Sequence, residues 1–307
     1  MKPLVVLSTA LSLAAVFPAG AASLLPEKGR AILEAHQESI LPFSSSLSVS
    51  ASAGGRSMSA REQVVRGIAT VLTDDGLMVT ALSSLNPSSM LSGQKINTPQ
   101  GKVDLNISVE IKELKILTPD GLEIPASLVM KDTDLDLAFF RPKPGNDDVK
   151  DVKFHPVDLK DSGPGQVLDE VLLLNRLGKT FSYQTSTGTS EIISKIEKPR
   201  LLYRVAGATA GAPVYTAEGK ILGIAANRKP IGEDSGDGNA MRGLDMLVIL
   251  PAAEVAKIAD QARIAKPQDE EPAEKTAEKD AKPAAKEDKA AEKAPATEAK
   301  APQREEK

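Results

Sequence analysis

Short apolar runs separated by turn-forming residues constrain the fold of this 307-residue chain more than any other feature. Residues 64–73 and 77–80 are rich in β-branched and apolar side chains, and Asp74, Asp75 and Gly76 lie between them. An Asp-Gly pair between two such runs is a strong signal for a β-hairpin. The segment therefore predicts two antiparallel strands joined by a tight turn.

Segments typical of strands continue along most of the chain. A helix is expected at residues 26–40, a strand at 41–52, a loop at 53–59 and an exposed loop at 86–101. A second hairpin is expected around Pro-Asp-Gly at 119–121. Further short strands are expected at 132–141, 154–159, 169–175, 180–188, 190–196, 201–205, 221–226 and 246–251, before a helix at 252–264. Many short strands with frequent turn signals are typical of an all-β barrel or sandwich.

The two ends of the chain differ from this body. Residues 1–21 combine a basic start, a short apolar run and small residues before a cleavage site at Ala22, as a secretory signal peptide does. Residues 265–307 are almost wholly Ala, Lys, Glu, Asp and Pro, and cannot bury enough apolar surface to offset their ordering entropy. We expect an exported periplasmic or secreted protein with a folded part at 22–264. The disordered tail is either a solubilising extension or a tether.

Composition excludes several functional classes. The chain has no cysteine, so it cannot form a disulfide or a thiolate metal site, which fits a bacterial periplasmic protein. A formal charge of −4 and the lack of tryptophan give no support for nucleic-acid binding. No later stretch is apolar enough to span a membrane. Asp132, Asp134 and Asp136 alternate along a predicted strand without the glycine pattern of a calcium loop, so neither a metal nor a cofactor is expected.

Three motifs together indicate a family. Residues 207–214 read Gly-Ala-Thr-Ala-Gly-Ala-Pro-Val and lead through a short turn to Ile-Leu-Gly-Ile at 221–224. They resemble the GNSGGP nucleophile loop and following strand of trypsin-like serine proteases of the HtrA (Deg) type. Residues 67–80 resemble the family's GSGFIVSPDGYILTNNHVV segment, and 132–141 resemble its D…DLALLR strand.

The order of these motifs, with the closing strand and helix, extends the resemblance over roughly residues 30–264. It implies two six-stranded antiparallel β-barrels that join near residues 142–153, with short helices at both ends. The family usually continues into a peptide-binding PDZ domain, where this chain has only its tail.

The resemblance places the catalytic histidine on Ser83, the aspartate on Asp136 and the nucleophile on Ala210. It places the backbone N–H groups of the oxyanion hole at Ala208 and Ala210. A triad needs a hydroxyl nucleophile, an imidazole and a carboxylate, and only the carboxylate remains at these positions. Ala208 and Ala212 replace family glycines, and alanine disfavours positive φ, so the loop is either formed or collapsed. We therefore expect an inactive homologue in which Asp136 has a structural role.

Other residues offer weaker routes to hydrolysis. His36 lies on the first predicted helix and His155 between the predicted barrels, and neither falls on a catalytic position of the family. Thr209 adjoins Ala210, but its side chain should point away from the cleft. A lysine brought in by the fold remains an alternative.

These expectations lead to three functional hypotheses. The first is a non-catalytic homologue that binds unfolded or extended peptide or protein clients in its cleft, as a chaperone-like, regulatory or scaffold component. The second is a serine endopeptidase-type hydrolase with residual or unconventional activity. The third is a structural envelope protein that acts through its tail. A homo-oligomer is possible, and no residue of the sequence settles it.

Overall fold

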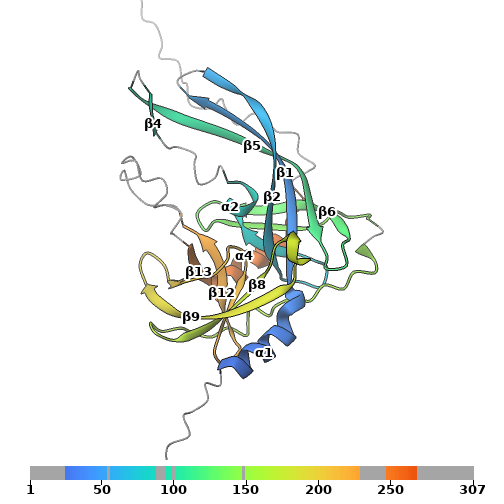
Figure 1. Cartoon of the computed structure of the whole chain (residues 1–307), viewed down its shortest axis with the longest axis vertical. Helices are drawn as coiled ribbons and strands as arrows, with labels where there is room; N and C mark the ends of the chain where they lie inside the picture. The colour runs from blue at the N-terminus through green and yellow to red at the C-terminus, as the bar shows by residue number, and fades with distance from the viewer. Residues whose placement is uncertain are drawn as a thin grey trace, which may run out of the picture. The chain divides into compact units, whose positions relative to one another are not determined.

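Two closed antiparallel β-barrels, with short helices near both ends, form the folded body of the protein (Figure 1). The computed structural model describes residues 25–53, 56–87, 95–98, 101–146, 149–228 and 247–267. The expected fold class is confirmed. The predicted signal peptide and nearly all of the predicted tail lie outside the described residues, as does a second unit of the chain at Glu271–Lys307.

The first barrel is a ring of six strands closed by pairing between its first and last members. In spatial order the ring comprises β1 (Ile40–Ala53), β2 (Arg56–Val71), β3 (Met78–Ala81), β7 (Leu137–Pro142), β6 (Glu123–Asp132) and β5 (Gly101–Leu117). A short strand, β4 (Lys95–Thr98), pairs with β5 outside the ring. In its core the rings of Phe43 and Phe140 meet edge to face with centroids 5.7 Å apart. Gly67 leaves room for the Phe43 ring, which a Cβ atom at that position would meet at 2.6 Å.

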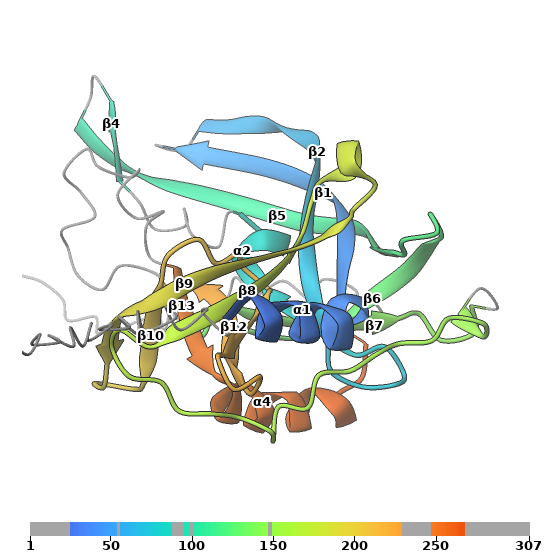
Figure 2. The ribbon, with the colours of Figure 1, turned by 60° about the horizontal axis from the view of Figure 1, so that its bottom comes forward.

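Three strands of this barrel are much longer than the ring requires. β1 pairs with β2 from Ile40–Thr70 to Ala53–Arg56, and with β5 as far as Ala53–Leu105. The outer parts of these strands run side by side away from the helices (Figures 1 and 2). The first barrel therefore carries an extended β-sheet arm.

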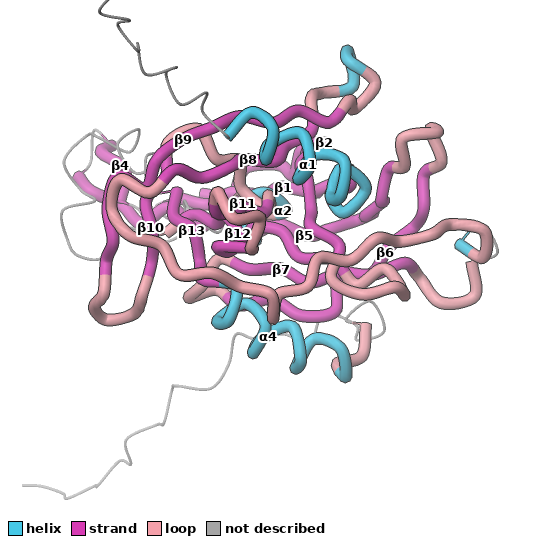
Figure 3. Tube along the Cα trace, turned by 90° about the horizontal axis from the view of Figure 1, so that it is seen from below, coloured by secondary structure: helices cyan, strands magenta, loops and turns pink. Residues whose placement is uncertain are grey.

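The second barrel is also a closed ring of six strands. In spatial order it comprises β10 (Leu202–Val205), β13 (Leu247–Pro251), β12 (Ile221–Asn227), β11 (Pro213–Thr216), β8 (Glu170–Arg176) and β9 (Thr185–Ile196). The helix α1 (Leu25–His36) contacts β9, and α4 (Ala252–Ile264) contacts β12 and β13 (Figure 3). Within the described ranges, no helix has the length and apolar character needed to cross a membrane.

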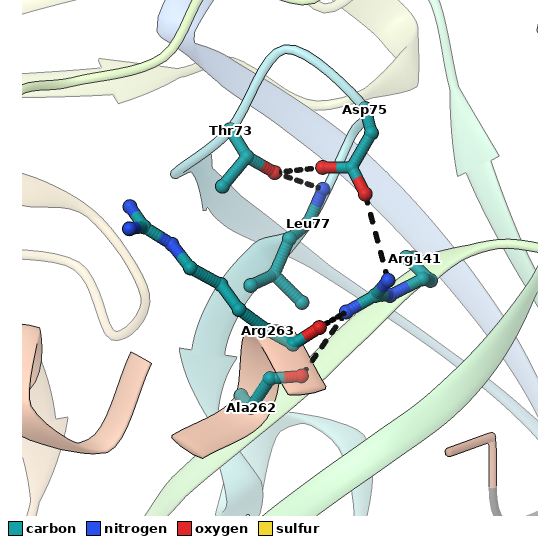
Figure 4. A network of polar contacts seen from close by, with 6 residues as sticks. All are labelled: Thr73, Asp75, Leu77, Arg141, Ala262 and Arg263. Atoms are coloured by element: carbon teal, nitrogen blue, oxygen red, sulfur yellow. Dashed lines mark hydrogen bonds and ion pairs between the residues drawn. The ribbon is translucent and has the colours of Figure 1, made fainter. Parts of the chain in front are cut away.

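Arg141, next to the end of β7, attaches α4 to the first barrel (Figure 4). Its Nη2 atom donates hydrogen bonds to the carbonyls of Ala262 and Arg263, at 3.0 and 3.1 Å. Its Nη1 atom lies 3.5 Å from a carboxylate oxygen of Asp75 in the β2–β3 turn. The last carbonyls of a helix lack partners within the helix, and a cation there is favourable. Arg141 therefore supplies hydrogen-bond donors to carbonyl groups at the C-terminal end of α4.

Several expected boundaries were wrong. The first helix ends at His36 and continues as a 3₁₀ turn, η1 (Gln37–Ser39), so Ile40 begins a strand. β2 begins at Arg56, within the expected loop at 53–59, because the β1–β2 hairpin pairs up to Ala53–Arg56. The expected loop at 86–101 contains β4. Residues 88–94 and 99–100 of that loop lie outside the described residues.

In the second half of the chain, residues 154–159 form no strand, although Phe154, Val157 and Leu159 are buried. The two strands expected at 180–188 and 190–196 are one strand, β9, preceded by a 3₁₀ turn at η3 (Lys179–Phe181). Apolar spacing indicates burial here but cannot distinguish a strand from an irregular packed segment.

His36 links the end of α1 to the second barrel. Its imidazole stacks on the ring of Tyr215 in β11, with centroids 4.8 Å apart and 20° between the ring planes. Burial lowers the pKa of His36 from its ordinary value, because the charged imidazolium loses hydration. Burial therefore favours the neutral form of this histidine.

This contact predicts a pH-dependent stability. With the pKa of His36 lower in the folded state than the ordinary value of about 6.5, the unfolded chain binds more protons as the pH falls through that value. The stabilisation is present above the unfolded pKa and is lost as pH falls toward the folded pKa. We expect urea denaturation to show a larger loss of stability between pH 7.5 and 5.5 for the wild type than for His36→Phe, which keeps the aromatic stack. His155 is common to both proteins and cancels in the comparison, and equal losses would contradict the prediction.

Candidate functional site

The positions assigned to the triad histidine and aspartate lie in direct contact. Ser83 is in α2 (Leu82–Leu85), which follows β3 directly, and Asp136 ends the turn that leads into β7. β3 and β7 pair at Ala81 and Leu137, so the residues next to this pair are brought together. The backbone N–H of Leu82 also donates to the carbonyl of Asp136 at 2.8 Å.

Two hydrogen bonds join Ser83 to the Asp136 carboxylate. The Ser83 backbone N–H donates to Oδ1 and the Ser83 hydroxyl donates to Oδ2, both at 2.7 Å. Both residues are buried, with exposed fractions of 8% for Ser83 and 5% for Asp136. A serine hydroxyl neither binds nor releases a proton near neutral pH, in contrast to an imidazole. The contact therefore fixes the carboxylate without supplying a titrating base.

Asn227, which the sequence did not indicate, completes this network from the second barrel. Its backbone N–H donates to Asp136 Oδ2 at 2.9 Å, and its side-chain Nδ2 donates to the Ser83 hydroxyl oxygen at 2.8 Å. The feature of the sequence that could have pointed to Asn227 is its polar side chain directly after the apolar run at 221–226. Its partners are 91 and 144 residues away in the chain, so no local pattern could identify them.

The turn before β7 also corrects an expectation about the acidic cluster. Asp134 and Asp136 lie in a turn at residues 133–136, whereas a strand at 132–141 was expected. Asp132 Oδ1 accepts hydrogen bonds from the backbone N–H groups of Asp134 and Leu135, each at 2.9 Å. Asp136 has a φ of +55°, a left-handed conformation that aspartate tolerates better than most residues. The cluster is therefore a turn that directs the Asp136 carboxylate inward.

The loop at residues 207–213 keeps glycine where the backbone needs it. Gly207 and Gly211 have φ values of +75° and +85°, whereas neither Ala208 nor Ala212 has a positive φ. The expected conflict between alanine and a left-handed backbone does not arise at those two positions. Ala210 is half-buried and carries only a methyl group.

Thr209, the nearest hydroxyl to Ala210 in sequence, is engaged with β8. Its Oγ1 accepts a hydrogen bond from Asn175 Nδ2 at 2.7 Å. Its carbonyl accepts a hydrogen bond from the N–H of Ala212 at 3.0 Å. These bonds hold Thr209 against the second barrel.

β12 anchors both parts of the candidate site. The N–H of Gly211 donates to the carbonyl of Ala225 at 2.7 Å, and the N–H of Ala225 donates to the carbonyl of Ala212 at 2.9 Å. Asn227, which binds Ser83 and Asp136, is two residues further along the same strand. The loop that contains Ala210 and the Ser83–Asp136 pair therefore meet along one strand.

The described contacts of both histidines are with residues other than Ser83, Asp136 and Ala210. His36 stacks on Tyr215, and His155 Nε2 lies 2.9 Å from a carboxylate oxygen of Glu38.

The chain is similar to one known family of protein domains. The model of the trypsin-like peptidase domain family matches residues 67–224, from Gly67 in β2 to Ile224 in β12. No curated protein matches the chain. The matched segment covers just over half of the chain and includes Ser83, Asp136 and the loop around Ala210. This match and the two closed six-stranded barrels show that the chain belongs to the trypsin-like peptidase domain family.

Proposed function

We propose that the protein is a non-catalytic homologue of the HtrA type that binds unfolded or extended peptide or protein clients in the cell envelope. The observation that carries the proposal is the hydrogen bond from the Ser83 hydroxyl to Asp136, where a protease of this type needs an imidazole. The expected signal peptide at residues 1–21 supports a periplasmic or secreted location. Such a protein acts as a chaperone-like, regulatory or scaffold component.

The chemistry of the loop supports the loss of hydrolysis. On this assignment, the residue at the nucleophile position is Ala210, and a methyl group cannot attack a carbonyl. The neighbouring Thr209 hydroxyl is held by Asn175. Without nucleophile and base, only oxyanion binding by the N–H groups of Ala208 and Ala210 remains, which gives roughly 10³–10⁴-fold rate enhancement over water in a working protease.

Client binding does not depend on the missing groups. An extended peptide can add to an exposed strand edge through main-chain hydrogen bonds, and its side chains then enter neighbouring pockets. We place the client at the end of β12, where Asn227 completes the strand beside Ser83 and Asp136. The main-chain groups of Ala225 are already bonded to the loop at Gly211 and Ala212, so the client would lie beyond them.

The test follows the fluorescence anisotropy of labelled, unfolded casein mixed with the purified mature protein overnight at neutral pH. We expect a lasting rise, which means binding without turnover. Active trypsin, added to a parallel sample, should lower the anisotropy below the free-casein value and sets the signal for cleavage. The same fall with this protein would show that it is a hydrolase. No change would count against cleft binding, and binding that disappears on deletion of residues 265–307 would assign the function to the tail.

A further inference from the structure

A pocket of about 280 Å³ opens beside Asn227, between the turn before β7 and the second barrel. Its inner wall is made of buried aliphatic side chains: Leu135, Leu202, Val248 and Leu250. This volume is just below the range of about 300–1,000 Å³ that is common for small-molecule sites, and it is large enough for a long side chain.

The mouth of the pocket is cationic. Arg200 and Arg228 both line it, together with one acidic side chain, Asp134. Within the described part of the chain, neither arginine forms an ion pair or a side-chain hydrogen bond. A guanidinium group binds a carboxylate through paired, charge-assisted hydrogen bonds. The pocket therefore combines an apolar wall for a methylene stem with two available donors for a carboxylate.

The pocket also lies where a bound client would pass. Asn227 lines it, and the same residue holds Ser83 and Asp136 from the end of β12. A peptide extended along this strand end would bring one of its side chains to the pocket, because alternate side chains of a strand point to the same side.

We infer that this pocket selects clients with an acidic side chain, whose carboxylate binds Arg200 and Arg228 while its stem packs on the aliphatic wall. The inference rests on the proposed function, since it requires an extended client in the cleft. The expected client therefore presents a side chain with an aliphatic stem and a carboxylate, and a client with a basic side chain at this position should bind more weakly.

The test uses fluorescently labelled short peptides of neutral, extended sequence, in which a single glutamate is moved through successive positions. Matched peptides carry glutamine or lysine at the same positions. We expect glutamate to lower the Kd about five- to tenfold relative to glutamine at one position of the peptide, as a charge-assisted contact does. The gain should shrink as salt rises, since the arginines lie at the mouth of the pocket.

The variant Arg200→Gln/Arg228→Gln should abolish the preference for glutamate, so that the matched glutamate and glutamine peptides bind it with the same Kd. Lys28→Gln/Arg30→Gln is the matched control, because it also removes two positive charges, from exposed residues of α1 that do not line the pocket. A preference for glutamate that survives Arg200→Gln/Arg228→Gln, or that the control also abolishes, would overturn the inference. Equal affinity for glutamate and glutamine peptides would overturn the pocket's role alone. If none of the peptides bound, both the proposed function and the role of the pocket would be contradicted.

Discussion

Gly211→Ala is expected to destabilise the folded protein by about 3 kcal/mol or more. Gly211 has a φ of +85°, and a Cβ atom there would lie 2.3 Å from the carbonyl oxygen of Ile68 and 2.5 Å from Oγ1 of Thr80. These two atoms form a hydrogen bond at 2.8 Å, and Thr70 Oγ1 donates to the Gly211 carbonyl at 2.7 Å. The methyl group would therefore break the contact between the loop of the second barrel and β2 of the first.

Gly219→Ala is the matched control for this prediction. Gly219 has almost the same backbone conformation, with a φ of +86°, but a Cβ atom there meets no atom closer than 3.9 Å. The free energy of unfolding of this variant should fall by only about 1 kcal/mol, which is the cost of placing alanine in a left-handed conformation. Urea denaturation of both variants separates the steric clash from backbone strain. Equal losses for the two variants would show that the loop and β2 are not packed as closely as described.

Asp136→Ala is expected to lower the free energy of unfolding by about 3 kcal/mol or more. The buried carboxylate accepts hydrogen bonds from the N–H and hydroxyl of Ser83 and from the N–H of Asn227. Alanine would leave these buried donors without an acceptor, at about 1–3 kcal/mol for each unsatisfied group. Alanine also tolerates the φ of +55° less well than aspartate does.

Asp136→Asn and Asp134→Ala bracket the effect. Asparagine keeps one acceptor oxygen and tolerates the left-handed backbone, so an intermediate loss is expected. The exposed Asp134 should tolerate replacement to within about 0.5 kcal/mol. Thermal and urea unfolding of the three variants measure the series. A loss for Asp136→Ala as small as that for Asp134→Ala would contradict a structural role for the carboxylate.

The local hairpins and the closing elements could be predicted from the sequence. Asp75-Gly76 marks the β2–β3 turn, and the structure has Gly76 at a φ of +83° there. The Pro-Asp-Gly segment joins β5 to β6 in the same way. The helix at 252–264 is confirmed as α4. These features depend on residues within a few positions of one another, where turn chemistry and apolar spacing determine the outcome.

The strand expected at 41–52 agrees closely with β1, but the length of β2 was less accessible. The charged residues at the start of β2 do not indicate a strand, because a strand in an arm needs no alternating apolar face. β11 was hidden within the motif at residues 207–224, where its four residues read as part of a loop. Its pairing with β8 and β12 requires both neighbours to be in place.

By itself, the sequence determined the family, the all-β class and the identity of the groups at the candidate site: a carboxylate at Asp136, a hydroxyl at Ser83 and a methyl at Ala210. Only the tertiary structure decided how they are used. Asn227 reaches Asp136 and Ser83 from another barrel, and Arg200, Arg228 and Asp134 line one pocket. The physical reason is that hydrogen bonds and pockets form between residues far apart in the chain, whose positions are set by the closure and packing of both barrels.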